Sequence, residues 1–259
     1  MLRCTCIFFV RDCSSMNNKE SPPPPPGPRR GRRKFWRQIP ALWMAEPERY
    51  SRTVEVFRTL ANKIAFISDT GKMKVFLMTG SDDKVGTSTV LFNTALMMGR
   101  SMLDRRILLV DTNIDRPSLH VAFDHSPSLC LMDYLLTGAA LADIVQPTFL
   151  ANLDIISCHR MDESLLSPFT TPSFSHFFSE VRKHYEIILL DSAPALRSSH
   201  TRMILPESDG VIIVTEANRT RVRVFEELVR LLHTENATLL GSFMNKRRYV
   251  IPKWIYQAM

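Results

Sequence analysis

The stretch FLMTGSDDKVGTSTVLFN, residues 76–93, joins two apolar segments through a polar loop. It starts with an apolar run of strand length, continues as a polar loop, and resumes an apolar pattern of helical spacing from Gly86 onward. A strand that passes through a short loop into a helix is the repeating unit of parallel α/β sheets. The stretch therefore predicts an α/β protein, provided that the rest of the chain supplies further strands.

Other apolar runs, each short enough for a buried strand, alternate with helical patterns along the chain. The predicted strands are residues 74–79, 106–111, 153–157, 186–191, 210–215 and 238–245, and the predicted helices are residues 47–67, 86–99, 173–185 and 221–234. Continuous apolar strands with helices between them are typical of a parallel sheet that is covered on both faces. We therefore expect a doubly wound parallel sheet.

The loop in the opening stretch resembles the phosphate-binding spacing G-x-x-x-x-G-K-[ST]. In such a P-loop, backbone N–H groups at a helix N-terminus hold phosphates, a lysine contacts the outer ones, and a hydroxyl contacts Mg²⁺. Gly86 matches the final glycine and Ser88 matches the hydroxyl, with Thr89 behind it. The lysine position is occupied by Thr87, and Lys84, the alternative cation, lies on the other side of Gly86. The loop thus predicts a P-loop NTPase-like fold with an altered ATP site.

Two acidic residues end predicted strands, Asp111 the strand 106–111 and Asp191 the strand 186–191. The carboxyl ends of parallel strands form the ligand-binding edge of such sheets. A single strand-end Asp is most often a turn or helix cap, but two of them beside a phosphate loop indicate a Mg²⁺ site. We therefore expect Asp111 and Asp191, with Ser88, to hold Mg²⁺ when ATP is bound.

The net charge of +7 is concentrated near the N-terminus. The segment PRRGRRKFWR, residues 28–37, carries six Lys or Arg side chains and no acid, which leaves the rest of the chain nearly neutral. It follows the run SPPPPPGP, which cannot form a core. Its basic and aromatic residues suit an anionic membrane surface, and they equally suit a solvated linker. A nucleic-acid arm ranks behind both, because no basic face follows in the predicted domain.

These changes in composition divide the chain into three parts. Residues 1–45 are expected to be a disordered Pro-rich and basic segment, residues 46–246 one domain, and residues 247–259 a short basic tail. No apolar run approaches the roughly 18 residues of a membrane span, and no secretory signal is recognisable, which indicates a cytoplasmic protein. The polar segment that begins at Met16 is a more ordinary N-terminal segment, so it stays undecided whether residues 1–15 are translated.

Five cysteines, an odd number, argue against a disulfide framework. Cys4, Cys6 and Cys13 lie close together near the N-terminus, but no second pair or neighbouring His completes a metal site there. The seven His residues are scattered without metal spacing, and the motif G-x-S-x-G does not occur. The sequence therefore predicts neither a structural metal centre nor a serine hydrolase.

Ordered motifs between Glu46 and Lys246 make this region resemble the cytoplasmic domain of bacterial tyrosine autokinases, the polysaccharide co-polymerase kinases, within the deviant P-loop ATPases. The motifs are VEVFRTLANKI (54–64), ILLVDTNIDRPSLHVAF (107–123), LMDYLLTGAALADIVQPTFLANLDIIS (131–157), YEIILLDSAPAL (185–196) and SDGVIIVTEANRTR (208–221). The run from Asp115 to His120 favours this kinase branch over the plasmid-partition ATPases, which remain a distant third reading.

The resemblance implies roles for particular residues. Asp111 and Asp191 match acidic residues of the family's catalytic site, which uses Mg²⁺ and ATP. Glu55 and Arg58 match a self-association motif on the leading helix, although its second arginine is Ala61 here. The family's C-terminal tail carries a cluster of tyrosines that accept phosphate. The candidates for that role in this chain are Tyr249 and Tyr256.

Departures from the family pattern suggest lost catalysis. Thr87 replaces the P-loop lysine, and Asn113 replaces the second aspartate of the motif that contains Asp111. Asp82 and Asp83 add negative charge that, by sequence, only Lys84 offsets, which should weaken binding of a polyphosphate. We therefore expect a regulatory, catalytically impaired kinase-like protein of exopolysaccharide or capsule biosynthesis and export. The alternative is an active ATP-dependent protein-tyrosine autokinase that controls polysaccharide chain length.

The resemblance also implies partners and a location. The expected partner is an inner-membrane polysaccharide chain-length (co-polymerase) protein, joined by a second copy of this chain or by a paralogous kinase. The protein would then act from the cytoplasm, peripheral to the inner membrane, with no nucleic acid involved.

Overall fold

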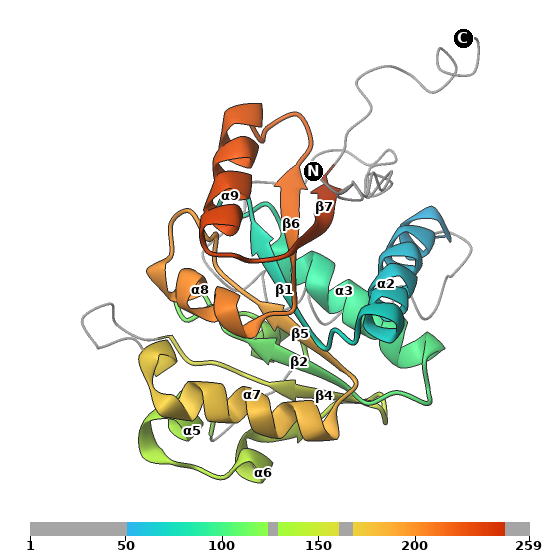
Figure 1. Ribbon diagram of the computed structural model, residues 1–259. Helices are drawn as coiled ribbons and strands as arrows, with labels where there is room; N and C mark the ends of the chain where they lie inside the picture. The colour runs from blue at the N-terminus through green and yellow to red at the C-terminus, as the bar shows by residue number, and fades with distance from the viewer. Residues whose placement is uncertain (1–50, 124–128, 161–167, 247–259) are drawn as a thin grey trace, which may run out of the picture.

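Seven strands form one sheet, in the order β3-β4-β2-β5-β1-β6-β7 (Figure 1). The strands are β1 (Val75–Gly80), β2 (Ile107–Asp111), β3 (Val145–Pro147), β4 (Leu153–Ile156), β5 (Ile187–Asp191), β6 (Gly210–Glu216) and β7 (Leu239–Asn245). All pairings are parallel except that of β3 with β4. The computed structural model describes residues 51–123, 129–160 and 168–246. The segments predicted for residues 1–45 and 247–259 lie outside them.

Helices cover both faces of the sheet, as a doubly wound fold requires. They are α2 (Ser51–Gly71), α3 (Thr87–Ser101), α4 (Leu119–Ala122), α5 (Leu131–Thr137), α6 (Leu141–Ile144), α7 (Pro172–His184), α8 (Ser199–Ile204) and α9 (Val222–Thr234), with short 3₁₀ turns at Pro168–Thr170 and Leu205–Glu207. In Figure 1, α2 and α3 lie on one side of the sheet, and α5, α7, α8 and α9 lie on the other. The predicted architecture is confirmed.

The two cores follow from the alternation of side chains along each strand. Phe76 and Met78 of β1 pack with α2 and α3, whereas Val75 and Leu77 pack with the helices of the opposite face. Every residue of β1 is buried. β2 and β5 are buried in the same way, so these strands read as continuous apolar runs, which is why their positions could be predicted from the sequence.

One strand was not predicted, and it makes the sheet mixed rather than wholly parallel. β3 pairs antiparallel with β4 at the edge of the sheet, where Gln146 lies opposite Ile155. It has three residues, none of them fully buried, and it ends in Pro147. A short partly exposed strand that contains proline has no apolar signal, and proline is tolerated at a sheet edge because its missing N–H leaves no partner unpaired.

Helix α2 places the residues of the predicted self-association motif on its outer side. Glu55 and Arg58 are exposed, while Phe57 is buried and its ring stacks on that of Phe243 of β7 at 5.7 Å. Ala61, which stands where the resembled family has a second arginine, is fully buried. None of the helices in the described part of the chain combines the length and the apolar character needed to cross a membrane.

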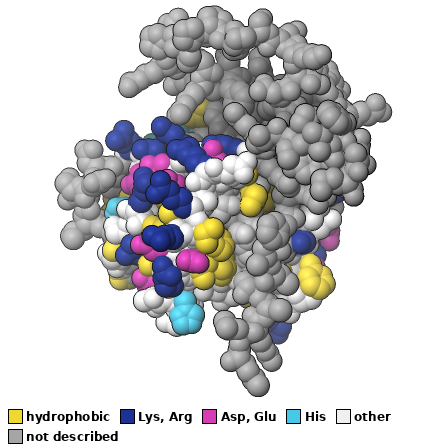
Figure 2. Space-filling view, turned by 90° about the horizontal axis from the view of Figure 1, so that it is seen from above, with side chains coloured by type: hydrophobic (Ala, Val, Ile, Leu, Met, Phe, Trp, Pro, Cys, Tyr) yellow, Lys and Arg dark blue, Asp and Glu magenta, His cyan; other side chains and the backbone are white. Residues whose placement is uncertain are grey.

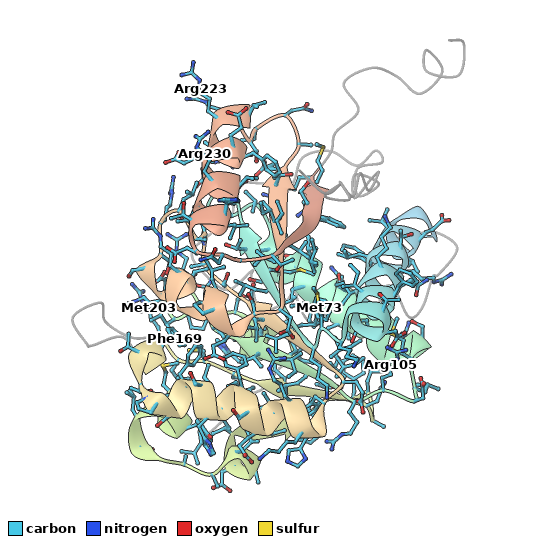
Figure 3. The ribbon with its side chains drawn as sticks, viewed as in Figure 1. Met73, Arg105, Phe169, Met203, Arg223 and Arg230 are labelled. Carbon is cyan, nitrogen blue, oxygen red and sulfur yellow. The ribbon has the colours of Figure 1, made fainter. Side chains whose placement is uncertain are left out.

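The outer surface carries mixed charge. Arg223 and Arg230 of α9 are exposed and extend away from the sheet (Figure 3). Figure 2 shows Lys and Arg side chains interspersed with Asp and Glu side chains on the face seen from above. This mixture agrees with the nearly neutral charge expected of the domain.

Candidate functional site

Asp111 and Asp191 are partners in the register of two neighbouring parallel strands, β2 and β5. Both are the last residues of their strands and both are fully buried. The predicted proximity of these two carboxylates at the carboxyl edge of the sheet is confirmed. Two acids in this position repel each other unless a proton or a cation lies between them.

Asp111 is held by backbone donors from the segment that follows it. Its Oδ1 accepts a hydrogen bond from the N–H of Asn113 at 3.1 Å, and its Oδ2 accepts from Ser118 at 2.9 Å and from Leu119 at 3.0 Å. Burial raises the pKa of Asp111 to about 6, and these three N–H groups act in the opposite direction. Asp111 therefore anchors the turn into α4 in addition to facing Asp191.

Asp191 has no such support. Among the described residues, neither oxygen of its buried carboxylate receives a hydrogen bond of regular geometry, although the Ser88 hydroxyl lies close enough to act as a weak donor. Burial first, and then the charge of Asp111, raise the pKa of Asp191 well above its usual value, while the nearby Ser88 hydroxyl lowers it. A buried carboxylate without a regular hydrogen bond fits a divalent cation, because Mg²⁺ takes oxygen ligands. Ser88, Asp191 and the neighbouring Asp111 therefore form a fitting set for Mg²⁺.

The loop between β1 and α3 has the backbone shape of a phosphate loop. Gly86 precedes α3 with φ 97°, a left-handed conformation that favours glycine. A Cβ at this position would lie 2.5 Å from Nδ2 of Asn245, which donates to the carbonyl of Val85 at 2.9 Å. The loop therefore closes directly against the end of β7, and Asn245, which sequence reasoning did not single out, holds it there.

The predicted phosphate-binding residues are the first turn of α3. Thr87, Ser88 and Thr89 open this helix and are partly buried. The Oγ1 of Thr87 lies 2.8 Å from where a Cβ of Gly80 would be, so the Thr87 side chain faces back across the loop. The first N–H groups of a helix have no partner within it, and together with the helix dipole they favour an anion at this end.

The acidic residues of the loop are paired, contrary to the expectation that only Lys84 offsets them. Arg197 forms ion pairs with Asp82 at 2.9 Å and with Asp83 at 3.4 Å. Arg116 also contacts Asp83, at 3.4 Å. These arginines follow β5 and β2, and the sheet topology brings their loops beside the β1 loop. The sequence could not show this convergence, because Asp83 and Arg197 are 114 residues apart.

Two lysines lie at the loop, one of them unexpected. Lys84 is exposed and has φ 60°. Lys246, immediately after β7, donates from Nζ to the carbonyl of Lys84 and to Oε2 of Glu216, the latter at 3.1 Å. The position of Lys246 just past a predicted strand at the ligand edge was the signal that could have pointed to it. Tyr249 and Tyr256 lie outside the described residues.

A cavity of about 320 Å³ adjoins the loop on the side of α9. Its lining residues are Ser81, Asp82, Val85, Arg219, Thr220, Arg221 and Val224. The hydroxyls of Ser81 and Thr220 lie 2.9 Å apart, and Thr220 Oγ1 also accepts the N–H of Glu216 at 2.9 Å. These bonds fix the turn after β6 against the β1 loop, so the cavity has a defined wall.

We expect the ion pairs of Arg197 to contribute little to stability. The Arg197 side chain is 60% exposed, and pairs of that kind contribute at most about 1 kcal/mol. Arg197→Ala should therefore change the free energy of unfolding by less than about 1 kcal/mol, measured by denaturant titration. A larger loss would mean that the loop depends on this arginine for its fold.

Arg182→Ala is the matched control, because Arg182 makes a better-buried pair. It donates to both oxygens of Asp209, at 2.7 and 2.8 Å, and to the carbonyl of Glu207. Its removal leaves Asp209 half-buried and without its cation, which should cost about 1–3 kcal/mol. If Arg197→Ala and Arg182→Ala lower the free energy of unfolding equally, the exposure of the arginine side chain does not determine the strength of these ion pairs.

Comparison with known proteins connects this geometry to a family. A sequence model of the family described as "AAA domain" matches residues 73–240. The tyrosine-protein kinase YwqD of Bacillus subtilis is 23% identical over 205 residues, which cover 79% of this chain and 85% of YwqD. The putative tyrosine-protein kinase EpsB of Ralstonia solanacearum is 24% identical over 197 residues, 74% of this chain but 26% of EpsB.

Solved structures show the same fold. The chimerical protein CapA2B2 superposes with a TM-score of 0.71 at 19% identity, over 80% of this chain and 90% of that protein. At this level of identity the similarity concerns the fold, and the roles of individual residues have to be argued from the site itself.

Proposed function

This chain belongs to the AAA domain family, and we propose from that premise that it is a regulatory, kinase-like protein of exopolysaccharide or capsule biosynthesis and export whose own kinase activity is impaired. Relatives named tyrosine-protein kinases support the kinase-like part of the proposal. Because the chain spans about a quarter of the length of EpsB, the activity and partners of such longer proteins are proposed for it rather than transferred to it.

The observation that carries the proposal is a difference between two parts of the site, the residues that would hold Mg²⁺ and the residues that would hold the phosphates of ATP. Support for the part that would hold Mg²⁺ comes from the buried Asp191, which has no hydrogen bond of regular geometry, and from the Ser88 hydroxyl beside it. The part that would hold the phosphates has the glycine and the helix N-terminus, but Thr87 replaces the charged donor. A charge-assisted hydrogen bond contributes about 1.5–3 kcal/mol, so its absence weakens binding of ATP by roughly 10- to 150-fold.

Neither neighbouring lysine restores that donor. Lys84 precedes Gly86 and is exposed, whereas a P-loop lysine acts from the start of the helix. Lys246 is already bonded to Glu216 and to the Lys84 carbonyl, and those bonds would have to break before it could reach a phosphate. When bound, Mg²⁺ would neutralise the charge between Asp111 and Asp191, and the first turn of α3 would orient the phosphates.

The alternative function, an active ATP-dependent autokinase, is favoured by one observation. Arg116 and Arg197 neutralise Asp82 and Asp83, so the loop repels a polyphosphate less than its sequence indicates. Titration with Mg·ATP separates the two functions: weak or absent binding supports the impaired protein, and tight binding supports the active kinase.

We propose that Glu55 and Arg58 join this chain to a second copy of itself. They are three residues apart on an exposed face of α2, as the (i, i+3) spacing requires. Glu55→Arg should place like charges across the interface and weaken self-association by about tenfold or more. Sedimentation velocity over a range of concentrations measures this.

The double variant, Glu55→Arg with Arg58→Glu, identifies the partner. If Glu55 faces Arg58 of a second copy, exchanging both charges restores self-association. If the face binds an inner-membrane chain-length protein, the exchange leaves that binding disrupted. Glu226→Arg, an exposed change on α9, controls for net charge. Unchanged association in the single variant, with that partner as well as with itself, would exclude this face as the interface.

A further inference from the structure

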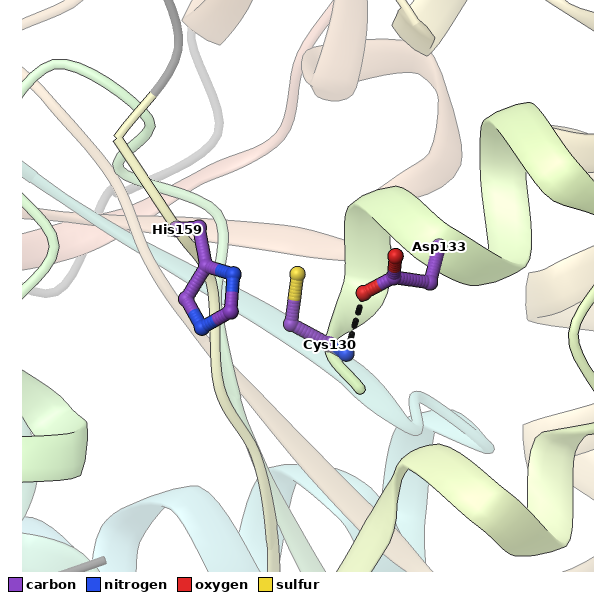
Figure 4. A group of neighbouring side chains, drawn as sticks. All are labelled: Cys130, Asp133 and His159. Atoms are coloured by element: carbon purple, nitrogen blue, oxygen red, sulfur yellow. Dashed lines mark hydrogen bonds between the residues drawn. The ribbon is translucent and has the colours of Figure 1, made fainter. Parts of the chain in front are cut away.

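A cluster of three unlike side chains lies where β4 ends and α5 begins. It consists of Cys130, Asp133 and His159, whose sulfur, carboxylate oxygen and ring nitrogen all lie within 4.8 Å of one another. Figure 4 shows the Cys130 sulfur between the imidazole of His159 and the carboxylate of Asp133. We propose that this cluster is a binding site for a divalent transition metal of the Zn²⁺ type, apart from the nucleotide loop.

The donor set selects the class of metal. Thiolate, imidazole and carboxylate together are ligands of Zn²⁺, whereas Mg²⁺ and Ca²⁺ take oxygen ligands. Zinc-to-ligand bonds of about 2.0–2.3 Å place the donor atoms of a tetrahedral site roughly 3.2–3.8 Å apart. Because the donor atoms of the cluster are at most 4.8 Å apart, a contraction of no more than about 1.6 Å would bring them to this spacing, and the side chain of His159 is exposed. Three protein ligands leave a fourth position for water.

The local fold holds two of the ligands in place. Cys130 is the N-cap of α5, and its N–H donates to Oδ2 of Asp133 at 2.7 Å in a capping box. This arrangement fixes the carboxylate beside the sulfur and leaves its other oxygen for a metal. The N–H of Leu131 donates to the carbonyl of Ser157 at 2.9 Å, which ties the start of α5 to the chain just before His159.

Helix capping alone does not account for the cysteine. Ser, Thr, Asp and Asn are the preferred N-cap residues, because their oxygen accepts the N–H groups of the first turn. The sulfur of Cys130 is a weaker acceptor, yet it is buried and faces a histidine from another element. Cys158, also buried, directs its sulfur to the carbonyl of His159 at 3.2 Å and is not counted among the three ligands.

The test uses the full-length chain with Cys4, Cys6 and Cys13 replaced by serine, so that thiols near the N-terminus cannot bind metal. Titration with Zn²⁺ by calorimetry should give one metal per chain. Titration with Co²⁺ should give the near-ultraviolet thiolate-to-cobalt charge-transfer band that reports a sulfur ligand. The absence of this band, or of Zn²⁺ binding, would overturn the proposal.

Two substitutions identify the ligands. Cys130→Ser keeps a good N-cap, so the helix should survive, and His159→Gln changes an exposed residue. Each should weaken Zn²⁺ binding by roughly a hundredfold or more, beyond the 10- to 100-fold typical of losing an outer partner. His233→Gln, an exposed histidine on α9, should have no effect. A cobalt band that survives Cys130→Ser, or an affinity unchanged by His159→Gln, would place the metal elsewhere and contradict the proposed site.

Discussion

Thr87→Lys is expected to tighten Mg·ATP binding by roughly 10- to 150-fold, the equivalent of about 1.5–3 kcal/mol. The substitution restores a cation at the first residue of α3, where a P-loop needs it. The Thr87 side chain already faces back across the loop toward Gly80, so a lysine would extend from the helix start in that direction. Calorimetric titration of both proteins at matched salt and Mg²⁺ concentration measures the difference.

Thr87→Gln is the matched control, because glutamine also reaches beyond threonine but carries no charge. It should tighten binding far less than lysine does. Equal effects of the two variants would mean that the gain comes from contact rather than from charge. If neither wild type nor Thr87→Lys binds ATP, the loop differs from a working P-loop at more than this one residue. Phosphorylation need not return in Thr87→Lys, because Asn113 would still stand where the resembled family has an aspartate.

Asp191→Asn is expected to stabilise the protein by about 1–3 kcal/mol at pH 8 in the absence of divalent cations. The substitution removes a buried negative charge that has no hydrogen bond of regular geometry and that faces Asp111 across the strand register. Denaturant unfolding at pH 8 and at pH 5, with a chelator present, measures the effect. Added Mg²⁺ should stabilise wild type and leave Asp191→Asn nearly unchanged, because the substituted site lacks one of its carboxylates.

The pKa values of the two carboxylates determine how the stability gained by Asp191→Asn changes with pH. Burial raises the pKa of both carboxylates, that of Asp111 to about 6. A carboxyl whose pKa is higher in the folded state takes up a proton on folding, so its effect on stability becomes less favourable as pH rises from about 4 through that value. The advantage of Asp191→Asn should therefore shrink between pH 8 and pH 5. An advantage that stays constant or grows toward pH 5 would contradict a buried, charged pair.

Asp209→Asn provides a control of opposite sign. Burial acts to raise the pKa of Asp209, but the hydrogen bonds from Arg182 and from the N–H groups of Val75 and Lys74 outweigh it, so the pKa is lowered. A lowered pKa means that the carboxylate stabilises the fold above its unfolded pKa, and that this stabilisation is lost as pH falls. Asp209→Asn should thus destabilise the protein at pH 8, where Asp191→Asn stabilises it.

The sequence predicts those parts of the fold and site that depend on local pattern. The central strands β1, β2 and β5 are buried along their whole length, so each appears as a continuous apolar run. Once the sheet is parallel, Asp111 and Asp191 must both lie at its carboxyl edge, because each ends a strand, and the adjacency of β2 and β5 then brings them together. The short antiparallel strand β3 has no such pattern and could not be recognised.

The features of the site that the sequence did not predict depend on contacts between segments that are far apart in the chain. The ion pairs of Arg197 with Asp82 and Asp83 offset the negative charge that the loop's own sequence indicates. They join loops that follow different strands, so no local pattern shows them. Cys130 and His159 likewise come from separate elements, so their sequence spacing gave no sign of a metal site. The lack of a well-formed hydrogen bond to Asp191 among the described residues is a property of the packed structure, which no motif encodes.

We propose that this chain has the residues that would hold Mg²⁺ in a nucleotide site but lacks the charged donor for the phosphates. Calorimetric titration of the full-length wild-type protein with Mg·ATP decides between this proposal and an active kinase. We expect weak binding that does not saturate in the low micromolar range, or no binding. Saturable binding at low micromolar ATP would contradict it, and the active autokinase would then be the better account of this protein.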